Sequence, residues 1–529
     1  DVLGLDEIGI DENFFALGGD SIRAIQVRAR AAQRGLTLTH EQLFEHQTIA
    51  SLARVVELDR APATAIEPLP PFALTPEEDR SRLPEGVEDA YPIAALQAGM
   101  IFHSELAPES AIFHDLHSFT LKAPVDLDTM RRGLREVMAR HATLRTGFEL
   151  SRYSRPLQLV YRDVEPPLEF TDLRDRTPED QRAALDLWLR EERQRTFDWR
   201  RAPLLRFHVH QLGDAHYQFT LSFHHAILDG WSAASLLTEL FNRARVLQEQ
   251  PDAPATPPLT CTFRDFVALE QQAEQSEECQ RFWREQLQAA PAVRLPRSSG
   301  ISTSGPGAED NDGGVGIVQV PISTEVIDGL RRFTRAAALP LKSVALAVHA
   351  KALSVETNQP AIVTGLVSHG RPEVLDGDRV LGLFLNTVPC VMRVGSGRWR
   401  ELVQDAFDCE RRLTPFRRYP LARLQRERGG PKERRQGVPV DGLFDVGFNF
   451  MHFHVYQGVQ QSDAMQVDGY TGYEETDLPL TANFLVEPIS GNIRLSLNYR
   501  RSEFSHEQIE RIGRRYAEAL AAIAADAES

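Results

Sequence analysis

The sequence has few of the features that mark a disulfide-stabilised, metal-binding or membrane protein. Its 529 residues include four cysteines, and none of them form a C-x-x-C pair. We therefore expect neither a disulfide framework nor a bound metal ion, and a reducing cytoplasm suits the chain. No apolar run is long enough to span a bilayer and no signal peptide opens the sequence, so we expect a cytoplasmic location and no membrane partner.

An excess of basic charge is also missing. The 59 Lys and Arg residues are outnumbered by 75 Asp and Glu residues, and the net charge of −16 argues against a nucleic-acid partner. The chain is 42% hydrophobic and 25% charged, which is typical of a soluble globular protein. Its length exceeds one hydrophobic core, so two to four folding units are expected.

The pattern over residues 1–60 predicts a small helical unit. Apolar residues recur on one face of a first helix, for which Gly35 is a suitable stop. Thr39 and Gln42 have capping-box spacing for a second helix, and Thr48 can cap a third. The first ten residues resemble the end of a helix that begins upstream, so we expect a piece of this unit to precede the sequence.

Two further regions follow the helical unit. Residues 61–89 are rich in proline and charge, which predicts an extended linker. From residue 90 onward helical patterns alternate with strands, such as a strand over residues 216–223 and a helix over residues 232–248. This alternation predicts an α/β fold.

The stretch LGGDSI, residues 17–22, contains a first candidate site. Gly18 and Gly19 permit a tight turn, Asp20 can cap the following helix, and Ser21 falls in its first turn. Taken alone, the pattern suits an ordinary helix-start serine as well as a functional one.

The stretch LSFHHAILDGWS, residues 221–232, contains a second candidate site. Alternating apolar residues predict a strand that ends at His224 and His225. A turn through Asp229 and Gly230 then leads into a helix. Chemistry is often placed at such a strand end, but a buried histidine pair that only completes a strand has the same pattern.

Residues 1–58 resemble a peptidyl carrier protein of a nonribosomal peptide synthetase, on the phrase VLGLDEIGIDENFFALGGDSIRAIQV. The resemblance implies a small all-α bundle of the four-helix type. It also implies that Ser21 carries covalent 4′-phosphopantetheine, which a phosphopantetheinyl transferase attaches. A helix N-terminus suits such a phosphodiester because its dipole and its N–H groups favour negative charge.

The rest of the chain, about residues 90–525, resembles the condensation domains of the same synthetases and chloramphenicol acetyltransferase-like acyltransferases generally. The segments YPIAALQAGMIFH, RHATLRTGF, TFRDFVAL, VLGLFLNTVPCVMR and LFDVGFNFMHFH follow in the family's order. The resemblance implies an α/β fold of two chloramphenicol acetyltransferase-like lobes, residues 90–262 and 263–529. A tunnel between the lobes would receive a donor carrier at one end and an acceptor carrier at the other.

The resemblance also implies roles for residues in the tunnel. His225 faces the tunnel, whereas His224 is structural, because the geometry of a strand end turns the two rings apart. Asp229 holds an arginine across the lobe, and Arg371 in VSHGRP is the candidate. Gly230 leaves room for the pantetheine arm.

The implied reaction is attack of an acceptor amine on a donor thioester, which forms a peptide bond and releases the donor thiol. An α-amino group has a pKa of about 7.7–8.0, so most of it is protonated at neutral pH. His225 can take the proton, or it can orient the amine while positioning supplies most of the rate. Both roles stay open. The implied partners are an adenylation domain, neighbouring carriers and their tethered substrates, in a bacterial secondary-metabolite or siderophore pathway.

Three related domain types remain as alternatives. An epimerisation domain shares the two histidines but usually continues with Val-Ser-Trp after the glycine, where this chain has Trp231 and Ser232. A heterocyclisation domain would have two spaced aspartates in place of the histidines. A degenerate, non-catalytic condensation domain is opposed by the intact His225, Asp229 and Gly230.

The donor's configuration poses a separate question. The segments YPIAALQAGMIFH and RRYPLARLQRE look more like the subtype that accepts D-configured donors, yet no epimerase lies between the carrier and the condensation domain. The carrier could be loaded with a D-amino acid, the subtype pattern could have drifted, or the donor could end in glycine. We favour glycine, because it presents no side chain to either stereochemical pocket.

Overall fold

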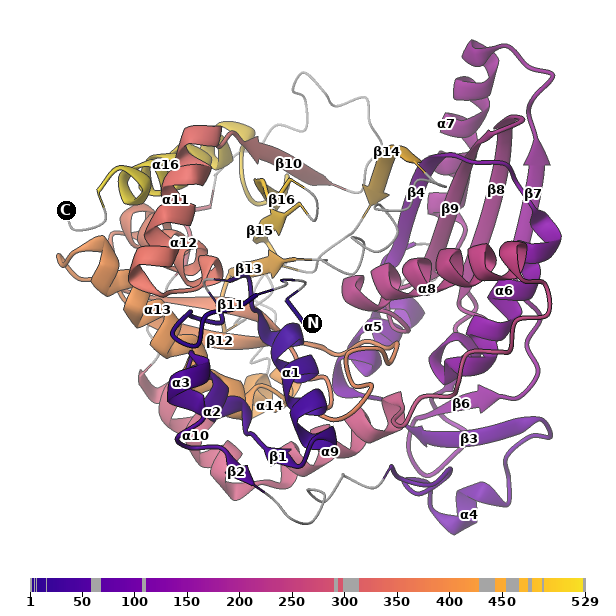
Figure 1. Ribbon diagram of the computed structural model, residues 1–529, viewed down its shortest axis with the longest axis horizontal. Coiled ribbons are helices and arrows are strands. Elements are labelled where there is room, and N and C mark those ends of the chain that lie inside the picture. The colour runs from indigo at the N-terminus through magenta and orange to yellow at the C-terminus, as the bar shows by residue number, and fades with distance from the viewer. Residues whose placement is uncertain are drawn as a thin grey trace.

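The protein consists of two α/β lobes, with a small helical unit lying against the second lobe (Figure 1). The computed structural model describes the whole chain apart from residues 1, 4, 6, 16, 59–67, 107–110, 290–293, 298–313, 428–442, 453–465, 474–477, 488–489 and 527–529.

The N-terminal unit contains the helices α1 (Ser21–Gln33), α2 (His40–Glu45) and α3 (Ile49–Leu52), and a short antiparallel pair, β1 (Leu36–Thr37) and β2 (Glu57–Leu58). The capping box of Thr39 and Gln42 and the cap at Thr48 are confirmed, and Gly35 follows α1 with a φ of 73°. The described residues of the first ten form coil, bend and turn. The expected helix end at the start of the chain is therefore wrong.

The linker is more compact than its composition predicts. After residues 59–67, which lie outside the described part of the chain, it forms turns and the short helix α4 (Glu77–Arg80) before β3 begins at Val87. Asp79 is fully buried and accepts hydrogen bonds from the backbone and side chain of Ser154. Residues 68–86 are thus not one extended segment, because buried polar contacts tie them to the first lobe.

The first lobe is built on a five-stranded sheet. Its strands lie in the order β14 (Gln466–Tyr473), β4 (His114–Lys122), β9 (His216–His224), β8 (Leu205–Gly213) and β7 (Leu168–Asp172). The helices α5 (Ala95–Leu106), α6 (Leu127–Arg140) and α8 (Gly230–Glu249) share a hydrophobic core with one face, and α7 (Pro178–Gln194) contacts β4 (Figure 1). Phe219, Leu221 and Phe223 belong to that core, as strand alternation predicts.

A smaller sheet and two further helices complete the fold of the described residues. The sheet has the order β3 (Val87–Pro92), β6 (Leu157–Tyr161) and β5 (Thr146–Glu149), and the helices are α9 (Phe263–Gln275) and α10 (Glu277–Ala289). A small core joins Tyr91 on β3, Phe263 on α9 and Phe384, the residue before β12 (Leu385–Arg393). Segments from both lobes therefore share one apolar cluster.

The second lobe is built on a six-stranded mixed sheet. Its order is β10 (Val315–Val320), β16 (Ile493–Arg500), β15 (Leu480–Val486), β13 (Val446–Met451), β11 (Ala361–His369) and β12 (Leu385–Arg393). The helices of this lobe are α11 (Thr324–Ala337), α12 (Leu341–Thr357), α13 (Trp399–Leu413), α14 (Leu421–Glu427) and α16 (His506–Ala525).

One strand crosses from the second half of the chain into the first lobe. β14, residues 466–473, pairs antiparallel with β4 and lies at the edge of the first sheet (Figure 1). A strand edge is stabilised when another strand satisfies its N–H and C=O groups. The division between residues 262 and 263 expected from the sequence therefore does not separate the lobes completely.

The sequence also predicted no disulfide framework and no membrane-spanning segment. All four cysteines are free and buried, and the sulfur atoms of Cys390 and Cys409 lie 3.2 Å apart. Within the described residues, no single helix has the length and apolar character needed to cross a membrane. Helices α11 and α12 have that length and apolar character only when they are taken together, and they are bent by 111° relative to each other.

Candidate active site between the lobes

The two histidines lie where β9 meets the turn into α8. The backbone N–H of His225 donates to the carbonyl of Phe113, the residue before β4, at 2.7 Å. Asp229 is the N-cap of α8 and accepts from the backbone N–H of Ser232, at 2.7 Å. The turn is thus held by hydrogen bonds at both of its ends.

His224 and His225 have different surroundings. His224 is 3% exposed, its Nδ1 accepts from the backbone N–H of Ala226, and its Nε2 lies 3.1 Å from Oγ of Ser104. Burial lowers the pKa of His224 to about 3, so the ring is neutral. The side chain of His225 is 20% exposed and lines a large cavity.

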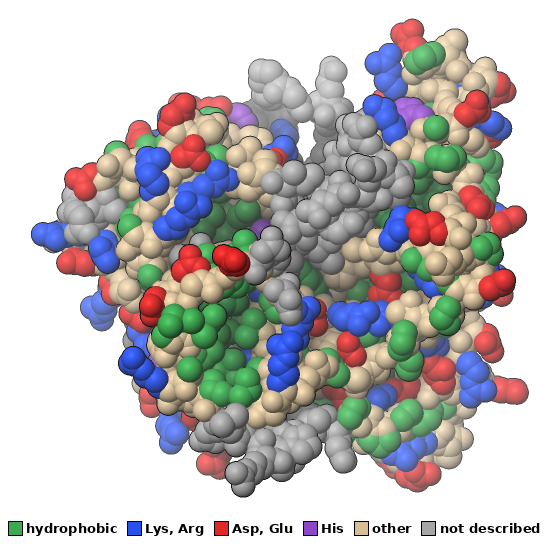
Figure 2. All heavy atoms as spheres, viewed as in Figure 1, with side chains coloured by type: hydrophobic (Ala, Val, Ile, Leu, Met, Phe, Trp, Pro, Cys, Tyr) green, Lys and Arg blue, Asp and Glu red, His purple; other side chains and the backbone are tan. Residues whose placement is uncertain are grey.

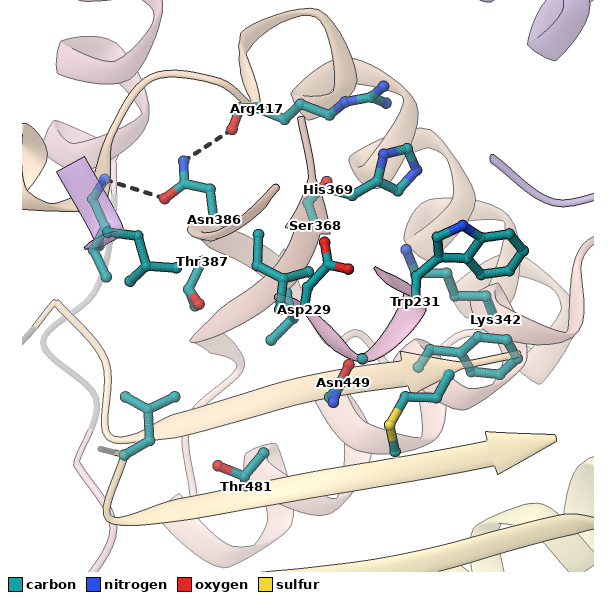
Figure 3. Close-up of a pocket in the computed structure, with 18 of the residues that line it drawn as sticks. Asp229, Trp231, Lys342, Ser368, His369, Asn386, Thr387, Arg417, Asn449 and Thr481 are labelled. Carbon is teal, nitrogen blue, oxygen red and sulfur yellow. Dashed lines mark hydrogen bonds between the residues drawn. The ribbon is translucent and has the colours of Figure 1, made fainter. Parts of the chain in front are cut away.

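This cavity has a volume of about 1790 Å³ and is lined by both lobes. The first lobe contributes His225, Asp229, Gly230 and Trp231, among others. The second lobe contributes Ser368, His369, Asn386, Thr387, Arg417, Asn449 and Thr481, which surround the space in Figure 3. Such a concave space with a few convergent polar groups is typical of a substrate site.

Asn386 is a lining residue to which sequence reasoning gave no role. Its Nδ2 donates to the backbone carbonyl of Arg417 at 2.9 Å, and its Oδ1 accepts from the backbone N–H of Leu421 at 3.3 Å (Figure 3). It therefore ties β12 to the chain entering α14. The available signal was its place in the segment GLFLNT, which carried part of the resemblance.

Asp229 and Arg371 meet in the interior, across the lobe junction. Nη2 of Arg371 donates to Oδ1 of Asp229 at 3.1 Å, and the two residues are 0% and 1% exposed. Asp229 also accepts from the backbone N–H of Phe384, at 3.1 Å. The guanidinium of Arg371 donates to Oγ of Ser232 at 2.7 Å and to the carbonyl of Val380 at 2.6 Å. These bonds join the start of α8 to the segment before β12.

Burial pulls the pKa of Arg371 downward, although Asp229 partly offsets this effect. The carbon Cζ of Arg371 also lies 4.2 Å from the ring centre of Phe384. The carboxylate, the two oxygens and the aromatic face compensate this buried guanidinium for part of its loss of water.

The N-terminal unit reaches the same cavity. Gly18, Gly19, Asp20 and Ile22, which surround Ser21 in the sequence, all line it. Ser21 begins α1, and Oδ1 of Asp20 accepts from the backbone N–H of Ile22 at 2.9 Å. The side chain of Ser21 lies outside the described part of the structure.

The N-terminal unit is held against the second lobe by apolar and charged contacts. The rings of Phe15 and Phe44 lie 6.1 Å and 6.2 Å from that of Phe407 on α13. Arg28 forms an ion pair with Glu373. In addition, Gln26 donates to Asp378 at 2.8 Å, and Arg411 pairs with Glu45 at 2.8 Å.

Asp115 on β4 is a lining residue that sequence reasoning missed. Its Oδ2 lies 2.7 Å from Nδ1 of His225. The available signal was a carboxylate inside an otherwise strand-like run, HDLHSFTLK, which pairs with the strand that ends at the histidines.

Within the described residues, no three His, Cys, Asp or Glu side chains are grouped so that they could hold a metal ion. On the face in Figure 2, acidic and basic side chains are interspersed over both lobes.

Comparisons with known proteins agree with this architecture. The model of the condensation domain family matches residues 87–529, and that of the phosphopantetheine attachment site matches residues 1–56. The AMB antimetabolite synthetase AmbE of Pseudomonas aeruginosa is 35% identical over 99% of this chain, which covers 24% of that protein. Tyrocidine synthase 3 of Brevibacillus parabrevis is 24% identical over 98% of this chain and 7% of its own length. The chain thus spans a quarter or less of these two relatives.

Solved structures show the same fold. The condensation domain of the monacolin K polyketide synthase MokA has a TM-score of 0.68, at 17% identity, over 84% of this chain and 99% of its own. The first condensation domain of the calcium-dependent antibiotic synthetase has a TM-score of 0.65, at 19% identity, over 84% and 98%. Together with the two family models, these matches identify the chain as a condensation domain of the nonribosomal peptide synthetase family, preceded by a carrier domain that bears covalent phosphopantetheine.

Proposed function

We propose that this chain forms a peptide bond with His225 as the catalytic residue and Ser21 as the attachment site of 4′-phosphopantetheine. The observation that carries the proposal is a shared cavity, because the residues around Ser21 and the side chain of His225 line one continuous space. The start of α1 fits a phosphodiester, since the first turn of a helix offers N–H groups and a positive dipole end. When bound, the cofactor supplies a thiol that holds the acyl group as a thioester.

The chemistry requires one new bond and one proton transfer. The amine nitrogen bonds to the thioester carbon, and the carbon–sulfur bond breaks. The nitrogen loses a proton to Nε2 of His225, and that proton leaves on the released thiol. An imidazole is suited to this exchange near neutral pH. Asp229 and Arg371 keep the turn after His225 in place through their ion pair.

The wider setting is part of the same proposal. An adenylation domain and a phosphopantetheinyl transferase are the expected partners for loading Ser21, and a further carrier presents the amine. We place the reaction in the cytoplasm of a bacterium, in the synthesis of a secondary metabolite or siderophore. A donor ending in glycine suits the subtype pattern, because no stereochemical pocket acts on it.

The proposal is tested first at Ser21. After incubation with a phosphopantetheinyl transferase and coenzyme A, the intact mass should rise by about 340 Da, the mass of the attached group. The variant Ser21→Ala should show neither this gain nor peptide formation from a loaded donor. Ser51→Ala, in another helix of the same unit, is the matched control and should be modified like the wild type. A gain of the same mass in Ser21→Ala would assign the cofactor to another residue.

A further inference from the structure

A buried carboxylate stands behind the imidazole of His225. Asp115 is 3% exposed, and its Oδ2 lies 2.7 Å from Nδ1 of His225. Phe113, two residues earlier in the sequence, accepts the backbone N–H of His225 at 2.7 Å. Both Phe113 and Asp115 line the cavity. The same short stretch at the start of β4 therefore holds the backbone of His225 and faces its ring.

Three other imidazoles surround the same carboxylate. His114 and His117 lie on β4, and His224 pairs with His114 across the sheet. Burial lowers the pKa of His114 to about 4 and that of His224 to about 3, and it also lowers the pKa of His117. These three rings are neutral near pH 7. His225, which is more exposed than His114 or His224, is the ring of this group that is open to substrate in the cavity.

We propose that Asp115 is a positioning residue for His225. Its carboxylate engages Nδ1, which assigns Nε2 to the substrate amine, and its negative charge stabilises the imidazolium that forms when His225 takes the proton. This inference rests on the role of His225 proposed above. Asp115 itself gains no proton, because the proton passes from the amine to Nε2 and then to the released thiol.

Physical chemistry favours this arrangement over a purely structural one. A carboxylate buried without a compensating charge is costly, whereas a nearby imidazolium repays part of that cost. The gain is realised only when the ring is charged, so the pair stabilises the state that follows proton transfer more than the state before it. A base held in one orientation also loses less freedom in the transition state.

Other titratable groups line the cavity and must be considered in any pH dependence. In addition to the three buried imidazoles named above, which do not line it, they include His103 on α5, Asp229 at the start of α8, Glu270 on α9 and His369 at the end of β11. Burial raises the pKa of Glu270 to about 7. Removal of the Asp115 charge lowers the pKa of His114, His117 and His224 further, because that charge favours their protonated forms. These three rings therefore stay neutral and do not produce the shift of the acidic limb.

The test is the pH profile of peptide formation by Asp115→Asn, with the donor loaded on the wild-type carrier domain. The rate at the plateau should fall by about 10-fold to 100-fold, a part of the factor that a general base supplies. KM for the acceptor should change less than kcat. The acidic limb should move to lower pH by about one to three units, because the charge that favoured the imidazolium is gone. Asp115→Glu keeps the carboxylate and should restore the limb.

Glu192→Gln is the matched control. Glu192 is a second buried carboxylate of this lobe, 3% exposed and paired with Arg206 at 2.7 Å, and it lies outside the cavity lining. Its substitution should lower the melting temperature and leave the acidic limb where it is. If Asp115→Asn fails to fold, Asp115→Ser offers a smaller side chain in the same space and the same readout.

The outcomes separate this inference from the function on which it rests. Should folded His225→Ala keep the wild-type rate, the proposed role of His225 is wrong and the role of Asp115 is lost with it. Should His225→Ala be slow while folded Asp115→Asn keeps the wild-type plateau and limb, the proposal for Asp115 alone is overturned. A loss of melting temperature with an unmoved limb would likewise assign Asp115 to structure.

Discussion

Two buried carboxylates stand at opposite ends of the segment from His225 to Asp229, and their partners differ. Asp229 is met by the guanidinium of Arg371 and by the backbone N–H groups of Ser232 and Phe384. All of these donors keep their hydrogens at any ordinary pH. Asp115 instead faces the imidazole of His225, whose charge depends on a single proton.

The different partners of Asp229 and Asp115 indicate what each carboxylate can do. A carboxylate held by permanent donors fixes geometry, because removing any partner leaves an unpaired polar group in the interior. A carboxylate beside a titratable ring changes its interaction energy when the ring gains a proton. The contacts of Asp229 therefore fix the geometry of the lobe junction, whereas the role proposed for His225 assigns proton transfer to the end of β9.

The largest effect that tests this comparison is expected at His225. His225→Ala should lower the rate of peptide formation by about 10²-fold to 10⁴-fold, the usual contribution of a general base, and should leave the fold intact. The measurement is product formed per unit time with a donor loaded on the carrier domain. His224→Ala is the matched comparison and should mainly lower stability. A folded His225→Ala protein with an unchanged rate would rule out both the basic and the orienting role.

The second-largest effect is a loss of stability, which we expect when Asp229 is removed from the junction of the lobes. Asp229→Ala should lower the free energy of unfolding by about 3–5 kcal/mol, because it leaves the guanidinium of Arg371 buried without its carboxylate. Urea denaturation followed by fluorescence measures the change. The double variant Asp229→Ala with Arg371→Met should recover part of the loss, since the unpaired charge is then absent. A fully stable Asp229→Ala protein that is only slower in catalysis would contradict the structural role.

The local sequence pattern predicted the strand, the turn and the helix start around the two histidines. Alternation identified the strand that ends at the histidines, and the glycine and aspartate marked the turn into α8. The contact between Asp229 and Arg371 spans 142 residues and was reached only through the family resemblance. Nothing in the local pattern of either residue specifies the other.

The remaining features depend on pairing between distant strands. Asp115 approaches His225 because β4 lies beside β9, and no spacing in the sequence encodes that register. The crossing of β14 into the first lobe has the same origin, since it depends on which strand edge is left open. The linker's composition predicted an extended chain, but burial of Asp79 folds part of it against the first lobe.

The smallest effect concerns His224, the neighbour that stays neutral. Its Nδ1 accepts a hydrogen bond from Ala226, so a proton on that nitrogen would place two donors face to face. Burial adds to this and lowers the pKa of His224 to about 3 in the folded protein, against about 6.5 in the unfolded chain. Between these two values the unfolded state binds more protons than the folded state. Stability from this group is therefore complete above about pH 6.5 and is lost as the pH falls toward 3.

His224→Gln should accordingly flatten the dependence of stability on pH. One buried neutral histidine contributes a slope of up to about 1.4 kcal/mol per pH unit below pH 6.5, and the variant should lose that contribution while the one from His114 stays. Denaturation at pH 7, 6 and 5 measures the slope. His506→Gln is the control, because that ring is 62% exposed on α16 and its removal should leave the slope unchanged. An equal slope in wild type and His224→Gln would mean that His224 is charged in the fold, and the contrast with His225 would then be lost, because both rings could take a proton beside Asp115.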